Sequence, residues 1–155
     1  MTSLERLIRE EQELQFDRFD HDTAWALGVA LVDAARAAGA PLAIDIRCNG
    51  HQLFHAALHG TAPDNDAWLA ARKSRVVDRF GHSSLHVGER ARQEGTTFEE
   101  QMRLDRDAYA AHGGAFPVTV RGVGVVGTVA VSGLPQLEDH AFVVRVLSDF
   151  LGVPL

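Results

Sequence analysis

The pattern of apolar and polar positions predicts a β-hairpin in the first third of the chain. Between Leu42 and Cys48, apolar residues alternate with Ala43, Asp45 and Arg47. Asn49-Gly50 follows directly and leads into residues 51–58. An Asn-Gly pair between two such segments is a strong local signal for a two-residue hairpin turn. We therefore expect two antiparallel strands here.

A second hairpin is predicted near the C-terminus. Residues 116–121 alternate apolar and polar side chains, a connector rich in glycine follows, and Val125–Val131 is a second β-branched segment. This last segment carries no charge, which favours a strand covered on both faces in the middle of a sheet. Gly127 lies within it, and a glycine at such a position indicates a close approach by another backbone or by a ligand.

Apolar residues at helical spacing predict five helices. Four have a candidate capping residue at the start: Thr2 with Glu5, Asp22 or Thr23, Thr97 with Glu100, and Asp139. The first helix has an apolar stripe of Leu4, Leu7 and Ile8, and we interpret it as a lid or an oligomer contact. The segment 14–16 after it is compatible with a short strand. The predicted helices cover residues 2–13, 22–38, 63–80, 97–112 and 139–151.

This order of elements favours an α+β fold, in which helices flank an antiparallel sheet. The chain has 155 residues, of which 46% are hydrophobic. That is enough for one well-buried core and too little for two, so we expect a single domain over residues 1–155.

Charge and hydropathy exclude several classes of partner. The net charge is −6 and no basic block is present, which argues against nucleic acid and against an anionic membrane surface. The sequence shows neither a signal-peptide pattern nor an apolar segment of roughly 18 residues. We therefore expect a soluble, cytoplasmic protein. Cys48 is the only cysteine, and we interpret it as a small buried apolar residue.

Eight histidines are the first candidates for chemistry. His51, His55 and His59 have even spacing, so a continuous strand would place them on one face. Residues four apart on a strand lie about 13 Å apart, which is too far for a compact tetrahedral metal site, so we expect no metal there. The three form either a polar, partly exposed sheet face or the wall of a groove for a planar ligand.

A second candidate group lies on the predicted helix over residues 63–80. Asn65, Trp68 and either Arg72 or Lys73 lie near one face, where they would present an amide, an aromatic plate and a cation to an anionic ligand. The alternative is that Trp68 anchors the core and the cations face solvent. Ser83 lies near His82, but the sequence has no Gly-x-Ser-x-Gly elbow around it, so a catalytic triad is not expected.

A third group combines the segment from His112 to Phe116 with Asp139 and His140. Gly113-Gly114 allows a tight turn, and Phe116 begins the predicted strand. Asp139 and His140 lie where helix-terminal amides would face a carboxylate or a phosphate.

Across these three groups the sequence resembles the haem-degrading-domain family, also described as GlcG-like or HbpS-like. The motifs that carry the resemblance are Asp64-Asn65 with Trp68 and Lys73, Phe80–Ser84, Gly113–Pro117, Val126–Val129, Val131–Pro135 and Asp139-His140. The resemblance implies a profilin-like fold and assembly into a homo-oligomer, either a dimer or a larger ring. It also implies haem binding or degradation in some relatives.

Three functional hypotheses stay open at this point. The first is a small-ligand-binding oligomer with haem as cofactor, in which His82, His112 or His140 ligates iron and Lys73, Arg72 or Arg75 meets the propionates. The second is a non-enzymatic assembly or adaptor module, and the third is an enzyme acting on a small anionic metabolite. No catalytic residue is assigned. The predicted ligand-binding residues are Asn65, Trp68, Lys73, His82, Ser83, His112, Gly113, Gly114, Phe116, Asp139 and His140.

Overall fold

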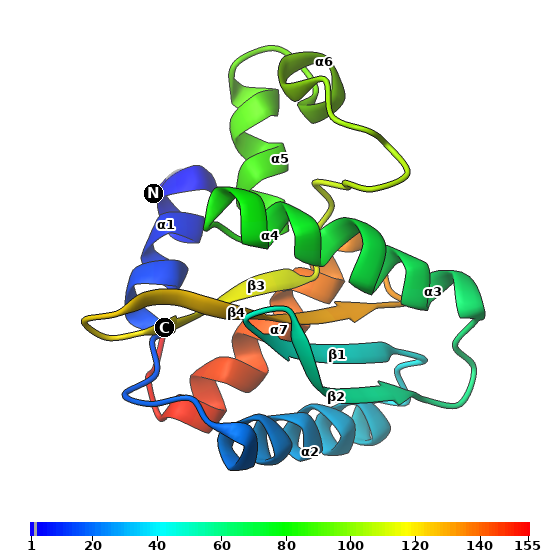
Figure 1. The fold of residues 1–155 in the computed structure, drawn as a ribbon, viewed down its shortest axis with the longest axis vertical. Coiled ribbons are helices and arrows are strands. Elements are labelled where there is room, and N and C mark those ends of the chain that lie inside the picture. The colour runs from blue at the N-terminus through cyan, green and yellow to red at the C-terminus, as the bar shows by residue number, and fades with distance from the viewer. Residues whose placement is uncertain (2) are drawn as a thin grey trace.

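The computed structural model describes residue 1 and residues 3–155, apart from the side chain of residue 70. The four strands come as two consecutive pairs, with helices before, between and after them (Figure 1). In chain order they are α1 (Ser3–Glu13), α2 (His21–Ala38), β1 (Ala43–Cys48), β2 (His51–Ala57), α3 (Pro63–Ala67), the π-helix η1 (Trp68–Lys73), α4 (Ser74–Phe80), α5 (Ser84–Gln93), α6 (Phe98–Met102), β3 (Ala115–Val120), β4 (Gly124–Ser132) and α7 (Gln136–Leu151).

The four strands form one antiparallel sheet in the order β2-β1-β4-β3. Both predicted hairpins are confirmed. Asn49 and Gly50 have φ values of 50° and 80°, the left-handed conformation that a tight hairpin turn requires. β4 is a central strand, as predicted, and a Cβ atom at Gly127 would collide with the carbonyl oxygen of Arg47 on β1. The expected close backbone approach at Gly127 is therefore confirmed.

Helices cover both faces of the sheet (Figure 1). α2 and α7 pack on one face, and the continuous helix made of α3, η1 and α4 packs on the other. The main apolar core lies under α2 and α7 and contains Ile44, Ile46, Val129 and Val131 from the sheet. The α+β class with an antiparallel sheet and flanking helices is confirmed. Over the described residues, none of the helices combines the length and the apolar character needed to cross a bilayer.

Two helix starts differ from the prediction. The N-cap of α2 is Asp20, whose carboxylate accepts a hydrogen bond from the Thr23 backbone N–H at 2.8 Å. α7 begins at Gln136, directly after Pro135, so Asp139 lies one turn inside the helix and does not cap it. The predicted ends are confirmed, because Gly39 and Gly152 both adopt the left-handed conformation that terminates a helix.

The segment from residue 82 to residue 112 was predicted incorrectly. α5 was missed, because only a few apolar residues mark its buried side and His86 lies among them. The helix expected over 97–112 is the short α6, which begins after Thr97 as predicted and ends at Arg103, where φ is 53°. The chain then runs in turns and extended backbone to β3.

The first helix is docked against the body of the protein. α1 packs on α5, and the interpretation of α1 as a lid or an oligomer contact stays a prediction. Ile8 is exposed, and the buried side of α1 carries Leu7 and Glu10. The predicted capping box at Thr2 lies outside the described residues. Beyond α1, Phe16 makes a single parallel bridge to Val120 in place of a full strand.

Candidate functional site

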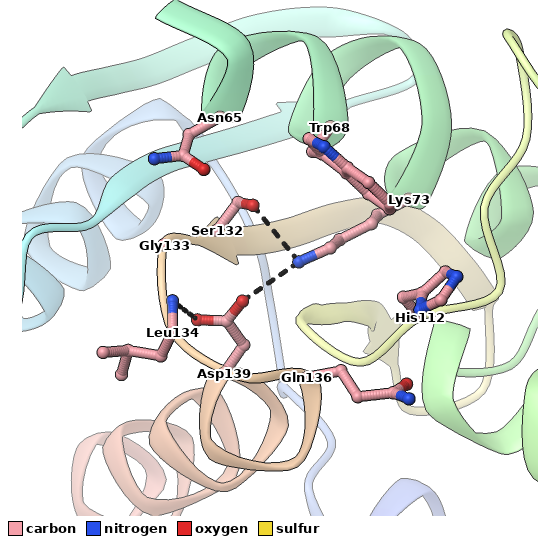
Figure 2. Close-up of a pocket in the computed structure, with 9 residues that line it drawn as sticks. All are labelled: Asn65, Trp68, Lys73, His112, Ser132, Gly133, Leu134, Gln136 and Asp139. Atoms are coloured by element: carbon pink, nitrogen blue, oxygen red, sulfur yellow. Dashed lines mark hydrogen bonds and ion pairs between the residues drawn. The ribbon is translucent and has the colours of Figure 1, made fainter. Parts of the chain in front are cut away.

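A polar pocket opens where α3 and η1 meet the end of β4 and the start of α7 (Figure 2). Its cavity has a volume of about 260 Å³. Side chains from four separate segments of the chain converge on it. The lining residues are Asn65, Trp68, Lys73, His112, Ser132, Gly133, Leu134, Gln136 and Asp139.

The π-helical segment decides which cation enters this site. The backbone N–H of Ser74 bonds to the carbonyl of Leu69, five residues earlier, so η1 is wider than an α-helix. Residues five apart then share a face, which places Lys73 on the side of Trp68 that meets the sheet. Sequence reasoning left Arg72 and Lys73 as alternatives. The structure directs Lys73 inward, where it is almost completely buried.

Lys73 forms a buried ion pair with Asp139. Its Nζ lies 3.1 Å from Oδ2 of Asp139, 3.2 Å from the carbonyl oxygen of Val131 and 3.4 Å from Oγ of Ser132. Burial lowers the pKa of Lys73 and raises the pKa of Asp139, because desolvation opposes both charges. The charge of each partner offsets part of the other's pKa shift. The pair is therefore an electrostatically costly feature at the base of the pocket.

Backbone packing around the pair leaves no room for larger residues. The other oxygen of Asp139, Oδ1, accepts a hydrogen bond from the Leu134 backbone N–H at 3.0 Å (Figure 2). Gly114 has a φ of 133°, and a Cβ atom there would collide with the carbonyl oxygen of Val131 and approach Nζ of Lys73 to 2.8 Å. Gly114, the second residue of the glycine pair predicted as a tight turn, thus lies directly against the ion pair.

An aromatic pair forms one wall of the pocket. The rings of Trp68 and His112 meet edge to face with centroids 5.3 Å apart, and the guanidinium of Arg72 lies over the indole at 3.9 Å. Desolvation lowers the pKa of His112. The charge of Glu99 opposes this shift, and the cationic side chains of Lys73, Arg72 and Arg92 add to it. At neutral pH the imidazole is therefore neutral, the form that can ligate a metal ion.

Two amide side chains complete the lining. Asn65 donates from Nδ2 to the hydroxyl of Thr61 at 2.9 Å. Gln136 accepts a hydrogen bond at Oε1 from the backbone N–H of Gly113 at 3.1 Å. Amide groups, which can bind carboxylate or carbonyl oxygens, thus border the cavity from two helices.

The other predicted site residues lie outside this pocket. His82 and Ser83 lie between α4 and α5, where both contact Glu11. The Ser83 hydroxyl caps α5 by accepting a hydrogen bond from the His86 backbone N–H at 3.2 Å, a structural role. His140 is buried on α7 with Nε2 2.7 Å from Glu10. Phe116 belongs to the apolar core.

The shared face on which both alternatives for His51, His55 and His59 depended is not formed. The register of β1 and β2 shifts between Ile46 and Arg47, so that His55 pairs with Asp45 and His51 pairs with Cys48. This bulge turns the two histidines to opposite faces of the sheet. His59 lies beyond the end of β2. The prediction of a shared face was wrong because period-two alternation fails at a bulge.

Sequence reasoning missed two glutamates on α1. Leu7, Glu10, Glu11 and Leu14 follow the spacing of a buried helical stripe, and the two acidic residues occupy its centre. Carboxylates in such positions need partners, which here are histidines of α5 and α7. The signal was present in the spacing, but the partners are distant in sequence.

The fold and the pocket define a small profilin-like α+β protein with a polar site at one end of its sheet. The profile of the family described as haem degrading protein HbpS-like matches residues 19–148. A UPF0303 protein of Streptomyces coelicolor is 64% identical over 94% of this chain and 92% of its own length. A UPF0303 protein of Serratia proteamaculans is 46% identical over 98% and 94%. The chain belongs to the HbpS-like family.

Solved structures share the fold. The crystal structure of the Ybr137w protein has a TM-score of 0.88 and 34% identity, covering 97% of this chain and 88% of that one. The PduOC:heme complex has a TM-score of 0.69 at 14% identity, covering 86% and 94%. HbpS has a TM-score of 0.65 at 20% identity, covering 89% and 93%. At these two lower identities, the likeness concerns the fold alone.

Proposed function

We propose that the protein binds a small ligand in the Lys73 pocket and that haem is the first ligand to test. The observation that carries this proposal is the convergence of Asn65, Trp68, Lys73, His112 and Asp139 on one cavity. The family description names haem degradation, and PduOC has been solved as a haem complex. We also expect a homo-oligomer on the basis of the family resemblance.

The donor set of the pocket suits one edge of a haem. A neutral His112 offers a ring nitrogen for iron, and Trp68 offers an apolar wall. Bound haem would supply an iron centre that binds and activates oxygen. The charge of Lys73 is already matched by Asp139, so Arg72, whose guanidinium stacks on the Trp68 ring, is a better candidate than Lys73 to meet a propionate. His112 replaces His82 and His140 as our candidate ligand, because it alone of the three lines this pocket.

The size of the cavity favours a second candidate, a small carboxylate. Pockets that enclose a drug-sized ligand have volumes of about 300–1,000 Å³, whereas this cavity has about 260 Å³. Most of a haem ring would therefore lie outside it. A small carboxylate would fit completely and would meet the amides of Asn65 and Gln136.

A hemin titration tests the first candidate. We expect a saturable Soret shift in the wild-type protein that is weakened by about tenfold or more in His112→Ala. His82→Ala is the matched control, because His82 lies outside the pocket, and it should titrate like the wild type. Light scattering on the same samples reports the size of the assembly. A response that does not saturate, or that is identical in all variants, would reject haem binding at this site.

A thermal screen with small carboxylates tests the second candidate. A ligand of this pocket should raise the melting temperature of the wild type but not of Asn65→Ala, which removes an amide at the rim. The absence of stabilisation by any carboxylate, together with a negative hemin titration, would contradict both candidates. The assembly module would then become the favoured function.

A further inference from the structure

A second cluster of chemically active side chains lies outside the pocket, between α1 and the start of α5. Nδ1 of His82 lies 2.8 Å from Oε2 of Glu11, and Nδ1 of His86 lies 2.9 Å from Oε1 of the same carboxylate. The two imidazole rings are tilted by 36°, with centroids 4.2 Å apart. One potential ligand atom from each residue lies within 4.8 Å of the other two. Within the described part of the chain, no other His, Cys, Asp and Glu side chains meet this criterion.

The types of ligand in this cluster match a divalent transition metal. Two histidines and one glutamate form a ligand set found in zinc sites that keep a fourth position open. Zinc bonds of about 2.0–2.1 Å in a tetrahedral site separate the ligand atoms by roughly 3.3 Å. The two histidines approach different oxygens of Glu11, at 2.8 and 2.9 Å, and one ligand atom from each residue lies within 4.8 Å of the other two, so side-chain adjustments would bring the three atoms to that geometry.

The surroundings of the cluster hold its ligands in place. The backbone N–H of Ser83 donates to Oε1 of Glu11 at 2.7 Å, and the Ser83 hydroxyl fixes the first turn of α5. Such contacts orient metal ligands in known sites. The His86 and Glu11 side chains are only 5% and 11% exposed, whereas His82 is 40% exposed. The site is therefore rigid on its inner side and open to solvent at His82.

The two rings present nitrogen atoms to the same carboxylate. Nδ1 of His82 and Nδ1 of His86 both lie within hydrogen-bond distance of Glu11. A neutral imidazole nitrogen is the commonest ligand for metal ions of this class.

We propose that Glu11, His82 and His86 bind a divalent ion of the zinc class and that this ion fastens α1 to α5. This site is separate from the Lys73 pocket, so the proposal stands or fails independently of the proposed ligand. The competing description is a pair of hydrogen bonds between the two histidines and one carboxylate. The two descriptions differ in whether a metal ion is taken up in stoichiometric amounts and whether that uptake needs His82.

Calorimetric titration of the chelator-treated protein with zinc chloride tests the site. We expect one zinc ion per chain in the wild type, and a loss of affinity by about tenfold or more in His82→Gln. His59→Gln is the control, since it removes an exposed imidazole from a loop and should bind zinc like the wild type. No saturable uptake by the wild type, or equal uptake in His82→Gln, would overturn the proposal.

A second variant gives a readout that does not depend on His82. Glu11→Gln keeps an oxygen that accepts hydrogen bonds but removes the charge that favours a metal. Zinc should raise the melting temperature of the wild type and leave Glu11→Gln unchanged. Cobalt chloride should produce the visible absorption of a tetrahedral site in the wild type only. Equal stabilisation of both proteins by zinc would show binding elsewhere and would reject the site.

Discussion

The two faces of the sheet differ in what they bury. Under α2 and α7, Ile44, Ile46, Val129 and Val131 form an apolar core. On the opposite face the strands contribute Ala43, Ala115 and Ala130 to a small apolar cluster. This face also buries polar residues. In the sheet and in the helix of η1 and α4 that covers it, the buried polar residues are Asp45, Lys73, Ser74, Thr128 and Ser132.

The two faces are therefore stabilised in different ways, and only one of them carries the pocket. Large aliphatic residues stabilise the α2 and α7 face without specific partners, because burial of apolar area is not directional. On the other face, small residues let a helix approach closely and leave space for charged groups that need defined partners. The pocket lies on this second face. Substitutions on the two faces should therefore have different consequences.

The largest effect is expected at the buried ion pair. Lys73→Met leaves the Asp139 carboxylate buried without its cation, and the free energy of unfolding should fall by about 3–5 kcal/mol. Urea denaturation measures this loss. The double variant Lys73→Met/Asp139→Leu removes both charges and should be more stable than the single variant. A loss below about 1 kcal/mol for Lys73→Met, as for a surface pair, would contradict this account.

The apolar face should respond to cavity formation alone. Leu31 on α2 is fully buried, and Leu31→Ala should lower the free energy of unfolding by about 2–5 kcal/mol. Val29→Ala, at an exposed position of the same helix, should change it by no more than about 0.5 kcal/mol. Both variants should keep the ligand affinity of the wild type. A selective loss of binding in Leu31→Ala would show that the two faces are coupled.

The smallest effect concerns acid stability at Glu11. Its pKa is lower in the folded state, so its contribution to stability is present above about pH 4.5 and is lost as the pH falls through the folded value. Urea midpoints in chelator should fall less steeply below about pH 5 in Glu11→Gln than in the wild type. Glu138→Gln, at an exposed position of α7, is the control, and its urea midpoint should depend on pH as in the wild type. Parallel slopes for all three proteins would contradict the assignment.

Much of the fold could be predicted from the sequence, whereas the site could be predicted only as a set of separate motifs. Asn65, Trp68, Lys73, His112 and Asp139 were all candidates, and the structure places them around one cavity. His82 and His140 were candidates for the same site, but Glu11 and Glu10 hold them elsewhere. Motif position could not separate these groups, because it carries no information on which helix packs against which.

The sequence by itself determined the two hairpins, the antiparallel sheet and the ends of α2 and α7. These features rest on local physics, namely period-two alternation, an Asn-Gly turn and glycine caps. Only the tertiary structure decided the bulge that separates His51 from His55 and the choice of Lys73 over Arg72. It also decided the pairing of charges such as Lys73 with Asp139, 66 residues apart. A buried charge takes the partner that packing brings to it, and packing depends on the whole chain.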